Sequence, residues 1–217
     1  MPVLPYCILL PNSGISIPET GVMNSQVHQL RTGDLLALYS EIEKSDIQPK
    51  AFQPAALEFH RVVHAMFENA AVVPFRFPTW LTMQELTRHL QQESQRYTSF
   101  LTNHANHVQM ELRVTPPPIS SPTGTSGTEH LRARAAESQR LRTIEDTLKN
   151  LLSAQVIEWR ERHTPAGLRL YALVARTNIA GFRERLSENE HQGNLRSSGP
   201  WPATEFLERN KSLHPES

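Results

Sequence analysis

Two histidines, His60 and His64, come closest in type and spacing to a reactive site. On a helix, residues four apart project from one face, so the two imidazoles could bind a metal ion such as zinc. A catalytic zinc needs three protein ligands, and neither an H-E-x-x-H motif nor a carboxylate motif accompanies this pair. We therefore favour packed or hydrogen-bonded histidines, and keep a small metal-dependent hydrolase that uses His60 and His64 as an alternative.

Other catalytic motifs are absent from the sequence. It contains no nucleophile elbow G-x-S-x-G, no P-loop and no G-x-G-x-x-G. The single cysteine, Cys7, excludes an internal disulfide and a multi-cysteine zinc site, and its apolar neighbours predict a buried, unreactive thiol. We expect no catalytic residue, no bound metal and no cofactor.

Charge and hydropathy limit the classes of partner. The 217 residues include 22 Lys and Arg against 22 Asp and Glu, so no net field attracts nucleic acid or an anionic membrane. No run approaches the ~18 apolar residues of a membrane span, and the amino terminus lacks the pattern of a secretory signal. We expect a cytoplasmic protein that binds neither nucleic acid nor membranes.

Two proline-containing motifs are the most distinctive stretches. Gly199-Pro200-Trp201-Pro202 cannot form a helix or a central strand, because proline fixes φ and lacks an N–H; it predicts a surface or edge feature. Its tryptophan either covers the protein's own core or anchors a partner. In the second motif, Val72–Thr79, Arg76 follows a short predicted strand. We expect Arg76 to pair with a carboxylate, the favoured interpretation, or to face a partner.

These motifs, and their order along the chain, resemble those of the F/L family of gas vesicle proteins. Family members have H-E-x-V-V, then V-L-P-x-R-F-G-T, then G-P-W-P-P-Y-S-F; here the first corresponds to His60-Arg61-Val62-Val63. Gly127–Arg134 is similar to G-x-x-Y-L-x-x-R at the start of the family's long helix. The chain departs from the family pattern at three places, and these are Arg61 for Glu, Pro78 for Gly, and Ala203-Thr204-Glu205 for Pro-Tyr-Ser.

The resemblance implies a non-enzymatic accessory protein for gas vesicle formation, located in the cytoplasm or at the vesicle. Its expected partners are the hydrophobic shell protein and other accessory proteins. A protein-interaction adaptor unrelated to vesicles remains a second alternative. The residues expected to bind a partner are Arg76, Phe77, Pro200, Trp201, Pro202 and Phe206. Those expected to have structural roles are His60, Pro74 and Gly199, with His60 bonded to a backbone group beside Val72–Thr79.

The spacing of apolar residues predicts an α+β fold with two small domains, 1–107 and 108–200, and a carboxyl-terminal tail, 201–217. In the first domain it predicts a helix with one apolar stripe and one or two further helices within Leu81–Asn106. The stripe consists of Phe59, Val62, Val63, Met66 and Phe67. The predicted strands are Val3–Leu10, Leu35–Tyr39 and Val72–Phe75.

The second domain is predicted as strand, helix, strand, strand, helix, strand, a ferredoxin-like plan with an antiparallel sheet. Val108–Val114 alternates apolar and polar residues strictly, as a strand with one solvated face does. The Pro116–Gly127 segment is expected to be a loop. The other predicted elements are a helix at Glu129–Ala154, a hairpin of Val156–Arg162 and Leu168–Ala175, a helix at Asn178–Glu190 and a strand at Asn194–Ser198.

Overall fold

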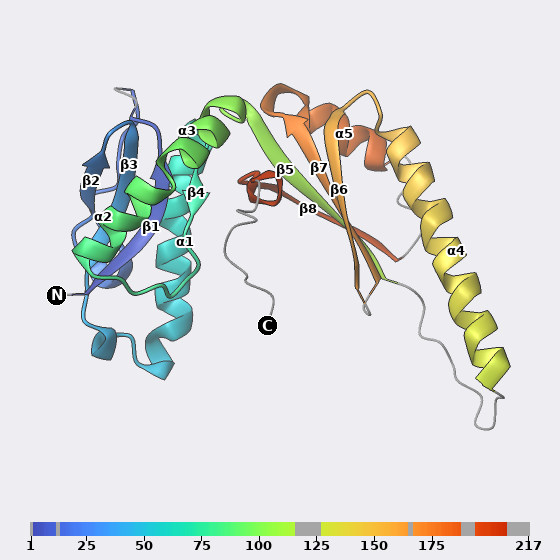
Figure 1. Ribbon diagram of the computed structural model, residues 1–217, viewed down its shortest axis with the longest axis horizontal. Helices are drawn as coiled ribbons and strands as arrows, with labels where there is room; N and C mark the ends of the chain where they lie inside the picture. Colours follow the sequence, from blue (N-terminus) through green and yellow to red (C-terminus); the bar gives the residue numbers. More distant parts are fainter. Residues whose placement is uncertain (1, 12–13, 116–126, 165–166, 188–193, 208–217) are drawn as a thin grey trace. The chain divides into compact units, whose positions relative to one another are not determined.

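The computed structural model describes residues 2–11, 14–115, 127–164, 167–187 and 194–207 (Figure 1). The chain forms two compact units, Met1–Asn106 and His107–Phe206, each built on a four-stranded antiparallel sheet. The predicted α+β class is confirmed. Parts of four predicted features lie outside the described residues, and these are the loop before Gly127, the turn at 165–166, the helix end at 188–190 and the tail from 208.

The sheet of unit 1 has the strand order β2-β3-β1-β4. Its strands are β1 (Val3–Leu9), β2 (His28–Thr32), β3 (Leu35–Glu41) and β4 (Val73–Pro74). Strand β2 was not predicted. It joins β3 through the two residues Gly33 and Asp34, and Gly33 has a φ of 58°, as a tight hairpin turn requires.

Three helices accompany this sheet, and Figure 1 shows α2 and α3 crossing in front of the strands. The helices are α1 (Phe52–Asn69), α2 (Met83–Gln92) and α3 (Ser94–Asn103), and three short 3-10 turns are η1 (Val22–Asn24), η2 (Lys44–Asp46) and η3 (Pro49–Ala51). The five predicted stripe residues of α1 are all buried. Thr82 and Glu85 form a capping box at the start of α2, and the single residue Glu93 separates the end of α2 from the start of α3.

Every residue of β1 is buried, so both faces of the sheet are covered. On β1, the Tyr6 hydroxyl donates to Ser40 Oγ (2.9 Å) and accepts from the backbone N–H of Val22 (2.9 Å). A Cβ at Gly21 would lie 2.0 Å from the Tyr6 oxygen, so only glycine fits. Cys7 is buried, as predicted, and burial raises the pKa of its thiol to about 12, which disfavours the reactive thiolate.

Unit 2 has the predicted order of elements. They are β5 (His107–Val114), α4 (Gly127–Leu151), β6 (Val156–Thr164), β7 (Gly167–Ala175), η4 (Arg176–Asn178), α5 (Ile179–Ser187), β8 (Leu195–Trp201) and η5 (Thr204–Phe206). The strand order is β6-β7-β5-β8, and Figure 1 shows α4 and α5 on one side of this sheet. The strand predicted to end at Ser198 extends to Trp201, because the proline motif itself pairs with β5.

The two faces of this sheet differ in composition. One face is apolar, and it consists of Val108, Met110, Leu112 and Val114 on β5 and Leu168, Leu170, Ala172 and Val174 on β7, all buried. It packs with buried residues of the two helices and of the turn after α4, among them Leu148, Leu152, Phe182 and Leu186. The intervening residues of β5 are Gln109, Glu111 and Arg113, so the second face carries the polar residues. The expected solvation of this face is found only at Arg113, because Gln109 and Glu111 are buried, and the segment with Glu205 lies against Gln109.

Candidate functional site

The Val72–Thr79 motif forms an edge of the unit 1 sheet. Strand β4 pairs with β1 only through Val73 and Pro74, and the backbone N–H of Phe75 then donates to the Tyr6 carbonyl (2.9 Å). Pro74 is accommodated because β4 is an edge strand, where a missing N–H breaks no ladder. The motif continues as a loop until Leu81, which pairs with the start of β1.

The aromatic side chains of this loop reach two different neighbourhoods. Phe77 lies against Phe52 (ring centroids 5.3 Å apart) and Phe59 (5.2 Å), both on α1. Phe75 lies beside His89 of α2 (5.7 Å). The loop therefore contributes one aromatic ring to the packing of α1 and another to the side occupied by α2.

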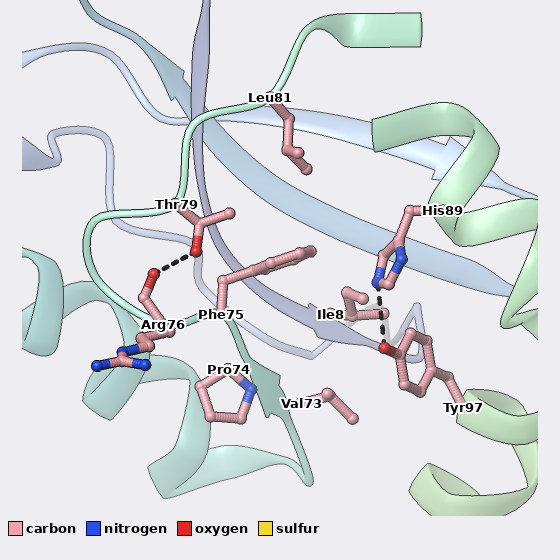
Figure 2. A pocket seen from close by; sticks show the side chains of 9 residues that line it. All are labelled: Ile8, Val73, Pro74, Phe75, Arg76, Thr79, Leu81, His89 and Tyr97. Carbon is pink, nitrogen blue, oxygen red and sulfur yellow. Dashed lines mark hydrogen bonds between the residues drawn. The ribbon is translucent and has the colours of Figure 1, made fainter. Parts of the chain in front are cut away.

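A pocket of about 350 Å³ opens beside Phe75 (Figure 2). Its lining residues come from β1, β4, the loop, α2 and α3, and they are Ile8, Val73, Pro74, Phe75, Arg76, Thr79, Leu81, His89 and Tyr97. The lining is mainly apolar. Two of its polar groups, the Tyr97 hydroxyl and His89 Nε2, lie 3.1 Å apart and satisfy each other.

Burial keeps this pair neutral. It lowers the pKa of His89 and raises the pKa of Tyr97, in each case because the charged form loses its hydration. At neutral pH the pocket therefore presents apolar walls and an uncharged hydrogen-bonded pair. Such a cavity accepts an apolar group more readily than a charged one.

Arg76 stands at the rim of the pocket and is exposed. Figure 2 shows its guanidinium directed away from Phe75 and Tyr97. Within the described ranges no carboxylate forms an ion pair with it, so the favoured expectation of a structural pair finds no support there and stays a prediction. Its place just beyond the short edge strand β4 leaves the side chain exposed to water.

The two histidines of α1 lie on the exposed side of that helix. The His60 and His64 rings are 5.7 Å apart, and His64 Nδ1 lies 3.7 Å from a carboxylate oxygen of Glu68. In the part of the chain that the structure describes, no third ligand group joins both histidines within metal-binding distance. The suggested bond from His60 to the backbone beside Val72–Thr79 stays a prediction.

One cluster of possible metal ligands does occur in unit 2. Oxygen and nitrogen atoms of Glu145, Glu161 and His163 lie within 4.8 Å of one another. The ammonium of Lys149 already occupies this cluster, 2.5 Å from Glu145 and 2.6 Å from Glu161. Its positive charge therefore offsets part of the negative charge of these carboxylates.

The Gly199–Trp201 segment lies on the edge strand β8, which confirms the predicted edge feature. Gly199 has a φ of 122°, and a Cβ there would lie 2.9 Å from the carbonyl oxygen of Gln109. Conformation and space thus both require glycine. The Trp201 side chain is 39% exposed, and its indole N–H donates to Ser198 Oγ (3.3 Å).

The residues after Trp201 are held against the polar face of the unit 2 sheet. The Glu205 backbone N–H donates to the side chain of Gln109 on β5 (3.0 Å), and Arg160 of β6 donates to the Glu205 carbonyl (2.8 Å). Phe206 is only 3% exposed and has the Arg160 guanidinium 5.3 Å from its ring. A partner contact through Phe206 would require this segment to open, and it stays a prediction.

Solved structures share this fold. The structure of this chain is similar to the crystal structure of the gas vesicle protein GvpF from Anabaena sp. PCC7120, with a TM-score of 0.75, 14% identity and coverage of 100% of this chain and 99% of that one. It is also similar to GvpF from Microcystis aeruginosa, with a TM-score of 0.71, 14% identity and coverage of 95% and 98%. No curated protein sequence matches.

The family is established by sequence. The model of the family described as gas vesicle synthesis protein GvpL/GvpF matches residues 3–208, so the chain belongs to that family, as its motifs indicated. Membership assigns it an accessory role in gas vesicle synthesis. Among the helices of the described ranges, none is both long and apolar enough to cross a membrane.

Proposed function

We propose that this protein is a non-enzymatic accessory protein of gas vesicle formation that binds the hydrophobic shell protein, or other accessory proteins, in the cytoplasm during assembly. The observation that carries the proposal is the family match over residues 3–208. A shell subunit must expose apolar surface before it is assembled. A protein that covers such surface reversibly would keep the subunit available for addition.

The pocket of unit 1 supports this proposal. It is mainly apolar, it holds no charged pair, and its volume of about 350 Å³ is within the range of sites that take a small apolar group. Its wall is formed by Val73, Pro74 and Phe75, which belong to the motif that resembles the family pattern. An apolar side chain of the shell protein is the occupant we propose.

Trp201 in unit 2 supports a second contact. A tryptophan that is 39% exposed at a sheet edge presents a large rigid ring, and such residues dominate protein interfaces. We assign Pro200 and Pro202 the role of holding this ring in place, because proline restricts the backbone on both sides. The two contacts are proposed independently, one for each unit.

The proposal needs no catalytic step. His60 and His64 lie exposed without a third ligand group among the described residues, which speaks against the hydrolase alternative. Binding and release would follow mass action, so the shell protein leaves when the growing vesicle binds it more tightly.

The test is co-expression with the shell protein of the same organism, followed by affinity capture. Two variants address the two contacts: Val73→Phe fills the pocket from β4, and Trp201→Ala removes the exposed ring. Two controls remove exposed apolar side chains elsewhere, Leu57→Ala on α1 and Leu131→Ala on α4. Circular dichroism and thermal unfolding verify that each variant is folded.

We expect wild type and both controls to capture the shell protein, and the two test variants to capture less of it. Loss with Val73→Phe alone would assign the contact to unit 1, and loss with Trp201→Ala alone would assign it to unit 2. Failure of the folded wild type to capture any shell or accessory protein would overturn the proposal.

A further inference from the structure

Four arginines lie in one row across the sheet of unit 2. The strand register places Arg162 of β6 opposite Arg169 of β7, Arg169 opposite Arg113 of β5, and Arg113 opposite Arg196 of β8. Directly opposed residues project from the same face, with neighbouring strands about 4.8 Å apart. One arginine from each strand therefore contributes to a row of about 14 Å. We call these four residues the arginine row.

The arginine row lies on the face of the sheet opposite the apolar one. Leu112 and Val114, next to Arg113, are buried with the helix side, as are Leu168 and Leu170, next to Arg169. Alternation along a strand then turns the arginines away from α4 and α5. Their side chains are accessible: Arg113 is 52% exposed, Arg162 44% and Arg169 39%, and Arg196 is also exposed.

Among the described residues, two carboxylates form ion pairs with the row. Glu111 pairs with Arg113 at 2.7 Å and lies 3.7 Å from Arg169, and Glu205 pairs with Arg162 at 2.9 Å. Arg196 forms no ion pair with any described residue. Within the described part of the chain, four guanidinium groups face two carboxylates, which leaves two positive charges in excess at positions where like charges directly opposite each other are unfavourable.

We propose that the arginine row is a docking surface for a protein partner that presents a row of carboxylates on one face of a helix. Acidic residues three or four positions apart on a helix have Cβ atoms about 5–6 Å apart, close to the ~4.8 Å between strands. A helix laid across the strands would thus match carboxylates to successive arginines. Guanidinium groups suit this role, because each can bind a carboxylate through two parallel hydrogen bonds.

The surroundings of the row favour a protein over a phosphate-bearing partner. Tyr171 lies under the Arg162 guanidinium (5.8 Å to the ring) on the same face, and Trp201 pairs with Gln109 of that face at the sheet edge. Arginine, tyrosine and tryptophan are the residues that contribute most to protein interfaces.

The docking surface goes beyond the binding of apolar shell surface proposed above and does not depend on it. The partner of the row is defined by negative charge, whereas the pocket and Trp201 are defined by apolar contact. If the protein failed to capture the shell protein, the proposal for the arginine row would be unaffected. If the acidic peptide failed to bind, the proposal of shell-protein binding would be unaffected.

The test uses the full chain and a synthetic helical peptide of about 20 residues, long enough to be helical on its own, with glutamate at every third or fourth position along one face. A matched peptide carries glutamine in place of each glutamate. The variant Arg169→Thr with Arg196→Thr removes the two excess charges and keeps strand-forming residues. The control variant, Arg140→Ala with Arg142→Ala, removes the same charge from the exposed surface of α4.

We expect the glutamate peptide to bind wild type and the α4 control equally, and the row variant roughly tenfold more weakly, with binding that declines as salt rises. The glutamine peptide should not bind. Equal losses in the two variants would reduce the effect to general charge attraction and overturn the proposal. Absence of binding to wild type, or tighter binding of a single-stranded oligonucleotide than of the glutamate peptide, would overturn it as well.

Discussion

In unit 1, β1 is buried along its whole length, whereas in unit 2 the strand β5 buries apolar residues on one face and the polar Gln109 and Glu111 on the other. Both strands are inner strands of four-stranded antiparallel sheets. A continuous apolar run must be covered on both faces, and an alternating strand on one only. The second face of unit 2 therefore includes polar residues, of which Gln109 and Glu111 are buried and the four arginines of the row are exposed.

The largest effect on stability should come from alanine substitutions at neighbouring positions of β1 and β7, because neighbouring residues of a strand lie on opposite faces of the sheet. We expect Ile8→Ala and Leu9→Ala in β1 each to lower the free energy of unfolding by about 2–5 kcal/mol, because both side chains are buried. In β7, Leu168→Ala should cost about as much, but Arg169→Ala less than about 0.5 kcal/mol. Urea denaturation, monitored by hydrogen exchange, would measure the stability of each unit separately. An Arg169→Ala variant as unstable as Leu168→Ala would contradict the comparison.

The second prediction concerns the residues that cover part of the polar face. Phe206→Ala should destabilise unit 2 by roughly 3 kcal/mol, because a ring that is 3% exposed leaves a cavity beneath Arg160. Trp201→Ala, which removes a more exposed ring, should cost only about 1 kcal/mol. Thermal unfolding of both variants measures the difference. Equal losses would show that burial of Phe206 is not what stabilises this segment.

A smaller effect is expected at the edge of the same sheet. Gly199→Ala places a Cβ 2.9 Å from the Gln109 carbonyl at a φ of 122°, and should lower stability by about 2 kcal/mol. The control Gly181→Ala lies in α5, where the new Cβ would meet no atom within 4 Å beyond its chain neighbours and its own helix backbone, and should be neutral or stabilising by up to about 1 kcal/mol. If both substitutions were neutral, the close approach of β8 to β5 would be refuted.

The smallest effect is a pH dependence confined to unit 1. Burial lowers the pKa of His89, so the unfolded chain binds a proton before the folded one does. His89 therefore lowers the stability of unit 1 as the pH falls below about 6.5. Between about pH 7 and pH 5 the melting temperature of unit 1 should fall less steeply in His89→Gln than in wild type. Identical slopes would contradict the burial of His89.

Much of the fold was predictable because the spacing of apolar residues along the chain indicates helices and strands locally. The apolar stripe of α1 and the alternation of Val108–Val114 each follow directly from the period of a helix or strand. Strand β2 was missed, since His28–Thr32 is half exposed and mostly polar. The two-residue Gly33-Asp34 turn before β3 was the available signal for a hairpin.

The candidate site was less predictable. The motif Val72–Thr79 was identified, but the pocket beside it also needs His89 of α2 and Tyr97 of α3, which only the packing of two helices brings within 3.1 Å. The sequence could not decide whether Arg76 pairs with a carboxylate or faces a partner. In the structure, Arg76 follows a two-residue edge strand and its side chain is exposed to solvent.

The arginine row shows most clearly what the sequence determines and what only the tertiary structure determines. The sequence alone sets three of the four arginines next to a leucine, in Leu112-Arg113, Leu168-Arg169 and Leu195-Arg196, so that a leucine turned toward the core places its arginine on the other face. Whether the arginines oppose one another depends on the register of four strands separated by helices and turns. A slip of one residue would move a strand's arginine to the opposite face, so the tertiary structure, which fixes that register, decided that the row exists.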